Sequence, residues 1–145
     1  MFIRTLGILG LASLLTMSSS AMAFTSSTTD VWNHHIQAWE ARSVEGITSD
    51  YTDESVLVLN NQLFKGHEQI ANVFTHLFKI FDAGVNRIDT PILFDRFVYI
   101  AWHFTPTGKQ EYFGSDTFVV EGGKIVLQTI ASPLYDVFPI LPLNN

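Results

Sequence analysis

The chain has 145 residues, no cysteine, and 14 Asp and Glu against 8 Lys and Arg, which gives a formal net charge of -6. Its basic residues are scattered singly, whereas a nucleic-acid groove needs clustered Lys and Arg, so we expect no nucleic-acid partner. The lack of cysteine excludes disulfides, thiolate nucleophiles and thiolate metal sites. The hydrophobic share of 47% is ample for the core of one domain.

Residues 1–23 have the pattern of a secretory signal peptide. Arg4 supplies the positive start, residues 5–17 form a short apolar run, and Ala21 and Ala23 form an A-x-A cleavage site. The run is shorter than the roughly 20 apolar residues that span a bilayer. We therefore expect cleavage after Ala23, a periplasmic or secreted protein, and no membrane span after cleavage; an uncleaved anchor is the alternative.

Three helices are predicted next. Residues 24–29 form a polar leader, Asp30 is the expected N-cap of a helix that reaches about Arg42, and Ser43 is expected to cap a short helix ending near Tyr51. The third helix, residues 67–81, has the clearest pattern. Its apolar residues recur at the helical spacing of one buried face: Ile70, Val73, Phe74, Leu77, Phe78 and Phe81.

The remaining segments read as strands. Residues 56–59 and 62–65 flank a turn at Asn60-Asn61, and extended segments follow at about 85–95, 97–105, 110–121 and 124–132, the last three as an antiparallel meander. Helices followed by long strands indicate an α+β fold with helices on one face of a curved antiparallel sheet. Residues 97–104 are apolar on both faces, so we expect a second subunit to cover the outer face.

Asp116 is the most informative polar residue. With the period of two of a strand, it shares a face with Gly114 and Phe118. On the helix-facing side its pKa would rise through desolvation, and it could stay protonated as a donor or proton carrier near neutral pH. The alternative is an exposed face, or a carboxylate that only satisfies its neighbours.

His35 is centred on the apolar stripe of the first helix, where it is either functional or a core histidine with one satisfied nitrogen. His34 points about 100° away, so we expect that both cannot face one site. His67 and His76 are expected on the surface, and His103 cannot be placed.

Three acidic residues before the first strand are interpreted as a solvated turn: Asp50, Asp53 and Glu54. Neither H-E-x-x-H nor H-x-H spacing occurs in the sequence, so no metal site is expected. The sequence also lacks a G-x-S-x-G elbow and a glycine-rich phosphate loop, and serine-hydrolase and nucleotide chemistry are therefore not supported.

The order of elements and several local strings resemble the nuclear transport factor 2-like superfamily, in particular its small SnoaL-like domains. The strings are residues 50–57, the helix 66–78, and the segments 99–102, 114–126 and 128–129. The similarity covers about residues 30–132, and we take 30–134 as the domain and 135–145 as an apolar tail. It implies a cone-shaped, cystatin-like α+β roll, in which a curved sheet wraps the long helix around a deep pocket, and dimerisation through the outer sheet face.

The ketosteroid-isomerase pattern of this superfamily implies roles for single residues. Asp116 falls where those enzymes keep a protonated acid in the oxyanion hole, and His35 falls where they have a tyrosine. The position of their general-base carboxylate falls at or next to Leu59. Since moving a proton between carbons in that way needs a carboxylate there, this departure argues against steroid isomerisation.

We therefore expect His35 and Asp116 to be catalytic, in a pocket with these walls: Trp39, Leu59, Phe74, Phe78, Trp102 or Phe104, Phe118 and Gln128. The leading hypothesis is an exported, cofactor-free acid/base enzyme of isomerase, cyclase or dehydratase type that acts on a small apolar molecule. The alternatives are a non-catalytic module for a hydrophobic ligand and a dimeric structural domain. The tail would close the pocket mouth or dock on the partner subunit.

Overall fold

The computed structural model describes residues 27–144, so the predicted signal peptide lies outside the described residues. The helices are α1 (Thr28–Glu40), α2 (Val44–Ser49), α3 (Gly66–Phe81) and α4 (Leu134–Val137). The strands are β1 (Val56–Leu59), β2 (Gln62–Lys65), β3 (Gly84–Ile88), β4 (Ile92–Phe94), β5 (Phe97–Pro106), β6 (Tyr112–Glu121) and β7 (Lys124–Ala131). No helix within the described residues is long and apolar enough to cross a membrane.

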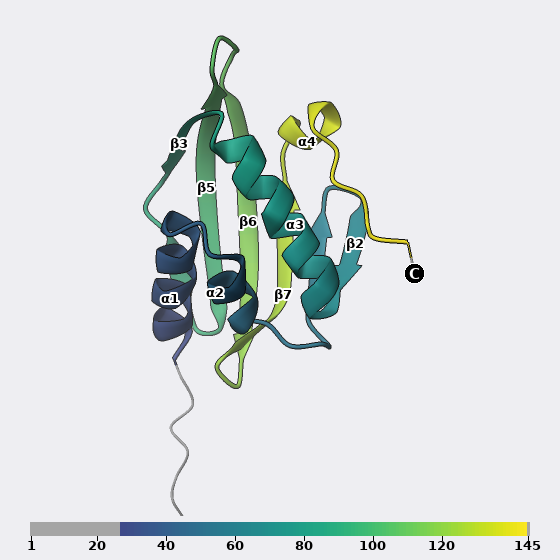
Figure 1. The fold of residues 1–145 in the computed structure, drawn as a ribbon. Coiled ribbons are helices and arrows are strands. Elements are labelled where there is room, and N and C mark those ends of the chain that lie inside the picture. Colours follow the sequence, from purple (N-terminus) through teal and green to yellow (C-terminus); the bar gives the residue numbers. More distant parts are fainter. Residues whose placement is uncertain (1–26, 145) are drawn as a thin grey trace, which may run out of the picture.

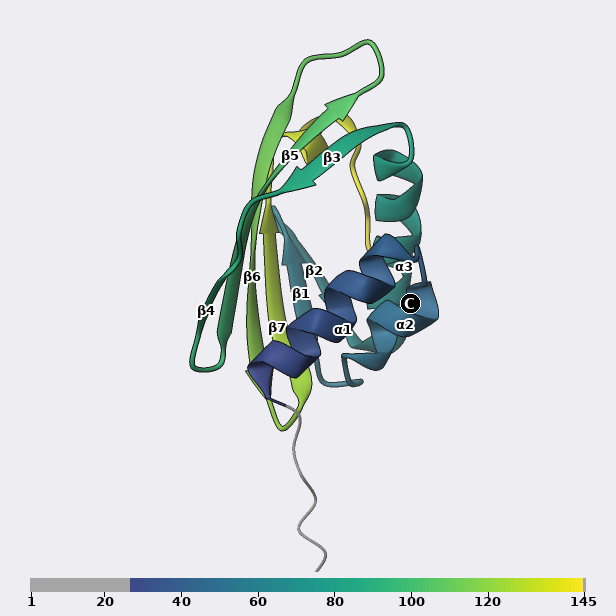
Figure 2. The ribbon, with the colours of Figure 1, turned by 90° about the vertical axis from the view of Figure 1, so that its left-hand side faces the viewer.

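The strands form one curved sheet in the order β2-β1-β7-β6-β5-β3, with β4 pairing with β5 (Figures 1 and 2). Strands β5, β6 and β7 form the predicted antiparallel meander. The pair β1–β7 is parallel, which the sequence analysis did not foresee. Helices α1, α2 and α3 lie on the same face of the sheet, and Figure 2 shows the sheet curving toward them. The α+β architecture with a curved, open sheet is thus confirmed.

Helix α3 packs on this sheet through the face that the sequence predicts. Its buried residues include every member of the apolar stripe, and Ile70 and Val73 are completely buried. Because the stripe faces the concave side of the sheet, α3 closes one side of the cone (Figure 2).

Several boundaries differ from the prediction. Helix α1 starts earlier because Ser27, not Asp30, is its N-cap. Asp30 is the third residue of the helix and forms a capping box with Ser27: each side chain accepts a hydrogen bond from the backbone N–H of the other residue. Helix α2 ends before Tyr51, with Asp50 as its C-cap. The segment predicted as one strand at 85–95 is split into β3 and β4, and Pro91, which lies between them, has no N–H for a ladder.

The two long central strands alternate between a buried and an outer face, as predicted for β6. On β6, Gly114, Asp116 and Phe118 all face inward and are buried. On the outer face of β5, Phe97 and Tyr99 remain 41% and 39% exposed. The subunit that the sequence leads us to expect over this face remains a prediction.

The C-terminal tail packs along its own chain. Tyr135 and Ile140 are buried, and side chains of α3 hold the tail backbone: Asn72 donates to the Leu141 carbonyl, and Gln69 bonds to both backbone groups of Leu143. The tail therefore lies beside α3 (Figure 1).

Gly114 makes room for the Trp102 indole. The two residues are directly opposite in the β5–β6 register, and a Cβ on Gly114 would lie 2.0 Å from Cζ2 of Trp102. The indole therefore lies across the backbone of β6 at a place where any side chain would displace it.

We predict that Gly114→Ala destabilises the protein by about 1–3 kcal/mol, the usual range for overpacking a filled core. Chemical unfolding followed by tryptophan fluorescence measures this. Gly108→Ala is the matched control, because a Cβ there meets nothing within 4 Å and only the φ of +73° opposes it. That backbone strain is worth about 1 kcal/mol. A Gly114→Ala protein as stable as the wild type would contradict the packing argument.

Candidate functional site

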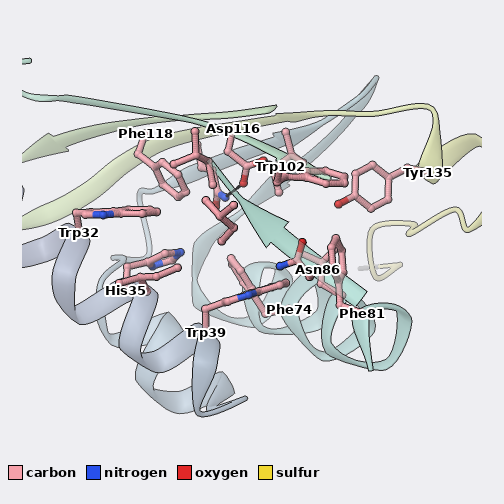
Figure 3. A pocket seen from close by; sticks show the side chains of 16 residues that line it. Trp32, His35, Trp39, Phe74, Phe81, Asn86, Trp102, Asp116, Phe118 and Tyr135 are labelled. Carbon is pink, nitrogen blue, oxygen red and sulfur yellow. Dashed lines mark hydrogen bonds between the residues drawn. The ribbon is translucent and has the colours of Figure 1, made fainter. Parts of the chain in front are cut away.

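An interior cavity of about 40 Å³ lies between the concave face of the sheet and helices α1 and α3 (Figure 3). Most of its wall is aromatic or aliphatic. Apart from the tryptophan indoles, the polar side chains that line it are His35, Asn86, Asp116, Gln128 and Tyr135. The cone therefore contains few polar groups, each in a fixed place.

All the site residues predicted from the sequence line this cavity except two. Leu59 is buried on β1 and borders a separate pocket beside the tail. Phe78 packs behind the wall, with its ring centroid 5.2 Å from that of Trp39. The sequence did not decide whether Trp102 or Phe104 forms one wall of the pocket. Trp102 lines the cavity, whereas Phe104 packs against Phe81.

The carboxyl of Asp116 is held by two donors from neighbouring strands. Trp102 Nε1 donates to Oδ1 at 2.8 Å, and Gln128 Nε2 donates to Oδ2 at 2.9 Å. The Gln128 amide is in turn oriented by Tyr51, whose hydroxyl donates to Oε1 at 2.5 Å. A continuous hydrogen-bond chain thus crosses the inner face of the sheet and ends at the carboxyl.

Burial raises the pKa of Asp116 from 3.8 to about 7, because the charged form loses its hydration. The hydrogen bonds from Trp102 and Gln128 lower the pKa and offset only part of that effect. Burial, followed by the negative charge of Asp116, likewise raises the pKa of Tyr135 well above 10, so that its hydroxyl stays neutral. Near neutral pH, Asp116 is therefore divided between its acid and carboxylate forms.

Both protein partners of Asp116 are donors, so neither can accept the proton of its neutral form. In Figure 3 the carboxyl lies beside the open space of the cavity. A ligand oxygen placed there would be an acceptor for that proton. The geometry thus suits a carboxylic acid that donates to a bound molecule.

His35 faces the same cavity from α1, where it is 4% exposed. Aromatic rings surround its imidazole: the centroid of Phe118 is 5.2 Å away, that of Phe74 5.7 Å and that of Tyr51 5.9 Å. Its Nδ1 lies 3.1 Å from Oδ2 of Asp50. When Nδ1 carries the proton, Nε2 is left unprotonated for the cavity.

One sequence interpretation is wrong here. Asp50 does not belong to a solvated turn: it is 6% exposed, because the end of α2 turns it inward beneath α1. Only His35 lines the cavity, as expected for two histidines that point about 100° apart, but both contact Asp50, with His34 Nδ1 2.6 Å from its Oδ1. Two histidines that point about 100° apart can contact the same carboxyl because each contacts a different oxygen of it. Asp53 and Glu54 are exposed, as expected.

A larger outer cleft of about 550 Å³ lies next to the cavity, between α1 and β3. Trp39 and Asn86 border both spaces. The Oδ1 atom of Asn86 is buried and has no hydrogen-bond partner within the described part of the chain. Such an atom at the junction of two spaces is suited to accept a hydrogen bond from a bound molecule.

Some lining residues were missed by sequence reasoning. Asn86 could have been found from the period of two of a strand, since it shares the inner face of β3 with Gly84 and Ile88. Tyr135 had none, because its place depends on how the tail packs. Within residues 27–144, no cluster of three or more His, Asp or Glu side chains could hold a metal ion.

Comparison with solved structures finds the same fold in several bacterial proteins, all at low sequence identity. An NTF2-like protein of unknown function from Cytophaga hutchinsonii is similar with a TM-score of 0.63 and 14% identity, over 81% of this chain and 99% of that one. A putative SnoaL-like polyketide cyclase from a Jannaschia species gives a TM-score of 0.63 and 13% identity, over 81% and 93%. A cystatin-fold protein from Novosphingobium aromaticivorans gives 0.61 and 16%, over 73% and 98%.

No curated protein matches the chain. The family model described as SnoaL-like domain matches residues 32–128, from α1 to the middle of β7. This span contains His35, Asp116 and the strands between them. With the curved sheet and the helix-lined cone, the match shows that the chain belongs to the SnoaL-like domain family.

Proposed function

We propose that the protein is a cofactor-free acid/base enzyme that acts on a small apolar carbonyl compound, with Asp116 as general acid and His35 as general base. One observation carries the proposal: a buried carboxyl with a pKa of about 7, bound by donors alone, shares an apolar cavity with an imidazole. General acid/base groups work best when their pKa lies near the operating pH.

The reaction begins with the carbonyl oxygen of the substrate against the protonated Asp116. His35 Nε2 takes a proton from the carbon next to the carbonyl, the electrons of that C–H bond form the enol double bond, and Asp116 gives its proton to the oxygen. The protonated His35 then gives its proton to another carbon of the enol, to the oxygen of a second carbonyl that the enol attacks, or to a hydroxyl that leaves as water. As the carbonyl re-forms, the enol O–H returns its proton to Asp116. These outcomes correspond to an isomerase, a cyclase and a dehydratase.

The size of the cavity constrains the substrate. About 40 Å³ holds roughly three water molecules, whereas ligand sites usually span about 300–1,000 Å³. The outer cleft of about 550 Å³ would hold the rest of the molecule. We therefore propose a substrate whose carbonyl end enters the cone while its body lies between α1 and β3. The name of the Jannaschia relative, a putative polyketide cyclase, is consistent with a carbonyl-rich substrate.

A binding module for an apolar ligand is the second candidate. It is favoured by Leu59, which occupies the position at which the isomerase pattern has its carboxylate base and which lies outside the cavity. On this alternative, Asp116 and Asn86 would hold the polar end of a ligand that is not converted.

The catalytic proposal predicts accelerated exchange of carbon-bound protons. We expect the wild-type protein to speed exchange of the α-protons of 2-tetralone with deuterated water, measured by proton NMR, because this records proton removal before any product forms. Asp116→Asn and His35→Asn should each slow the exchange by about 10²–10⁴-fold. The asparagine at position 35 keeps an amide near the Nδ1 position toward Asp50 while removing the base.

The matched control is Asp95→Asn, since Asp95 is exposed in the turn before β5, and it should exchange at the wild-type rate. Equal rates in wild type, Asp116→Asn and His35→Asn would exclude the acid/base roles. Saturable binding of 2-tetralone without exchange would favour the binding module.

The protonation of Asp116 also predicts a pH-dependent stability. Because its pKa is higher in the folded state, the folded protein holds the proton more tightly, and this stabilisation is complete below pH 3.8 and lost as the pH rises through about 7. Asp116→Asn has no such titration. The unfolding free energy of the wild type relative to this variant should fall by about 4 kcal/mol between pH 4 and pH 8.

Urea unfolding at each pH, followed by tryptophan fluorescence, measures this difference. The unfolding free energy of Asp95→Asn should differ from that of the wild type by an amount that changes little between pH 4 and pH 8. A constant difference between wild type and Asp116→Asn would show that the folded protein does not hold this proton.

We also propose that the enzyme is exported, on the strength of the signal-like pattern in residues 1–23. Expression of the full chain in a bacterial host, followed by fractionation and intact-mass measurement, should give a periplasmic or secreted protein that begins at Phe24. A cytoplasmic protein that retains its N-terminus would contradict the proposal, and Ala23→Asp, which spoils the cleavage site, should prevent processing.

A further inference from the structure

Asp50 links the cavity to the protein surface through two imidazoles. Its Oδ1 lies 2.6 Å from Nδ1 of His34, and its Oδ2 lies 3.1 Å from Nδ1 of His35. The His34 side chain is 52% exposed, whereas the His35 side chain is 5% exposed and lines the cavity. One buried carboxyl thus bridges a solvent-facing and a cavity-facing histidine.

The backbone holds Asp50 firmly in this place. Its N–H donates to the Ile47 carbonyl at the end of α2, and its carbonyl accepts a hydrogen bond from Ile125 of β7 at 2.8 Å. The backbone of Asp50 is therefore fixed between α2 and the sheet, and the two imidazoles hold its carboxyl beneath α1. This rigidity suits a group that orients another side chain.

The charged and titratable groups around this cluster are few. Asp116 lines the same cavity as His35. The ring of Tyr51 packs edge-on against the His35 ring. On the surface, Asp30 lies one turn before His34 but is bound to Ser27, and Lys124 donates to the Ser49 carbonyl. Within residues 27–144, only the two imidazoles make salt-bridge contacts with Asp50.

Two consequences follow from sharing one carboxylate. A carboxylate facing Nδ1 favours the tautomer with the proton on that nitrogen, so His35 presents Nε2 to the cavity as a base. Each imidazolium is also stabilised by the same negative charge, so a proton on His34 compensates that charge and weakens the attraction for a proton on His35. The two imidazoles are therefore coupled electrostatically through the carboxyl that they share.

We propose that Asp50 is a positioning residue that fixes the tautomer of His35, and that His34 adjusts the basicity of His35 from the solvent side. This inference rests on the proposed function for its catalytic meaning, but the coupling itself exists without any substrate. When His35 takes a proton from a substrate, His34 can release one to solvent from Nε2. Asp50 then stays paired with a single positive charge throughout.

The test is ¹⁵N NMR of the imidazoles in the full processed protein as a function of pH. In the wild type at high pH, His35 should have a protonated Nδ1 and an unprotonated Nε2. In His34→Gln, the pH at which His35 gains its second proton should rise by about one unit, the order expected for directly coupled groups. Asp50→Asn should lower that pH and allow both tautomers of His35.

The matched control is His103→Gln, because His103 is also a part-exposed histidine that contacts acidic side chains, Asp89 and Glu111, but lies on the outer face of β5. It should leave the titration of His35 unchanged. Because His34 is exposed, His34→Gln is expected to fold even if Asp50→Asn does not. An unchanged His35 titration in His34→Gln, or a wild-type His35 protonated on Nε2 alone, would overturn the inference.

The exchange of 2-tetralone protons provides a separate readout. If the proposed function holds, the pH profile of exchange in His34→Gln should shift in the same direction as the NMR titration of His35. If exchange is absent in all proteins but the NMR coupling is present, the proposed function fails and the Asp50 bridge stands. If exchange occurs without coupling, the bridge fails and the proposed function stands.

Discussion

The burial of the Asp116 carboxyl inside an apolar cone is the constraint on which the site depends. A carboxylate without hydration is unfavourable by several kcal/mol unless donors or a proton compensate it. Here the compensation is partial: Trp102 and Gln128 each supply one donor, and the raised pKa shows that burial still dominates. The fold thus leaves Asp116 between its two protonation states near neutral pH instead of fixing either one.

This balance requires several strands to be in register. Trp102 lies opposite Gly114, and Gln128 lies opposite Phe118, so both donors reach Asp116 diagonally from the flanking strands. Gly114 lets the indole approach, and Tyr51 orients the amide. Because these groups all point into the concave face, the polar end of a ligand has a defined place in an otherwise apolar cone. The proposed orientation of the substrate follows from that placement.

The sequence predicted the parts of this arrangement that depend on periodicity. The stripe of α3 and the inner face of β6, including Asp116 beside Gly114, follow from spacings of 3.6 and two residues. The position of Asp50 could not be predicted in that way. Its burial depends on how α2 turns beneath α1 and on a hydrogen bond to Ile125, which is far away in the sequence.

Periodicity alone likewise does not predict that His34 and His35 contact the same carboxyl. A helical wheel gives directions from the helix axis, but it does not show that a third group can lie between two of them. A carboxyl has two oxygens, and at Asp50 each oxygen meets a different imidazole. Leu59 and Phe78 illustrate a related point, since both are buried as core residues should be, yet neither reaches the cavity. Burial can be predicted from a pattern, whereas the choice between core and cavity wall depends on packing.

The two proposed acid/base groups, Asp116 and His35, differ in their connection to solvent, and this difference bears on the proposed reaction. Asp116 is surrounded by Trp102, Gln128 and the cavity, so its proton can exchange only through a ligand or the cavity opening. His35 has a second route, because Asp50 joins it to an exposed histidine. A proton taken by His35 can therefore be balanced by one released at the surface while the substrate still fills the cone. In the proposed reaction Asp116 would take its proton back from the same molecule, and His35 would be the group that equilibrates with bulk water.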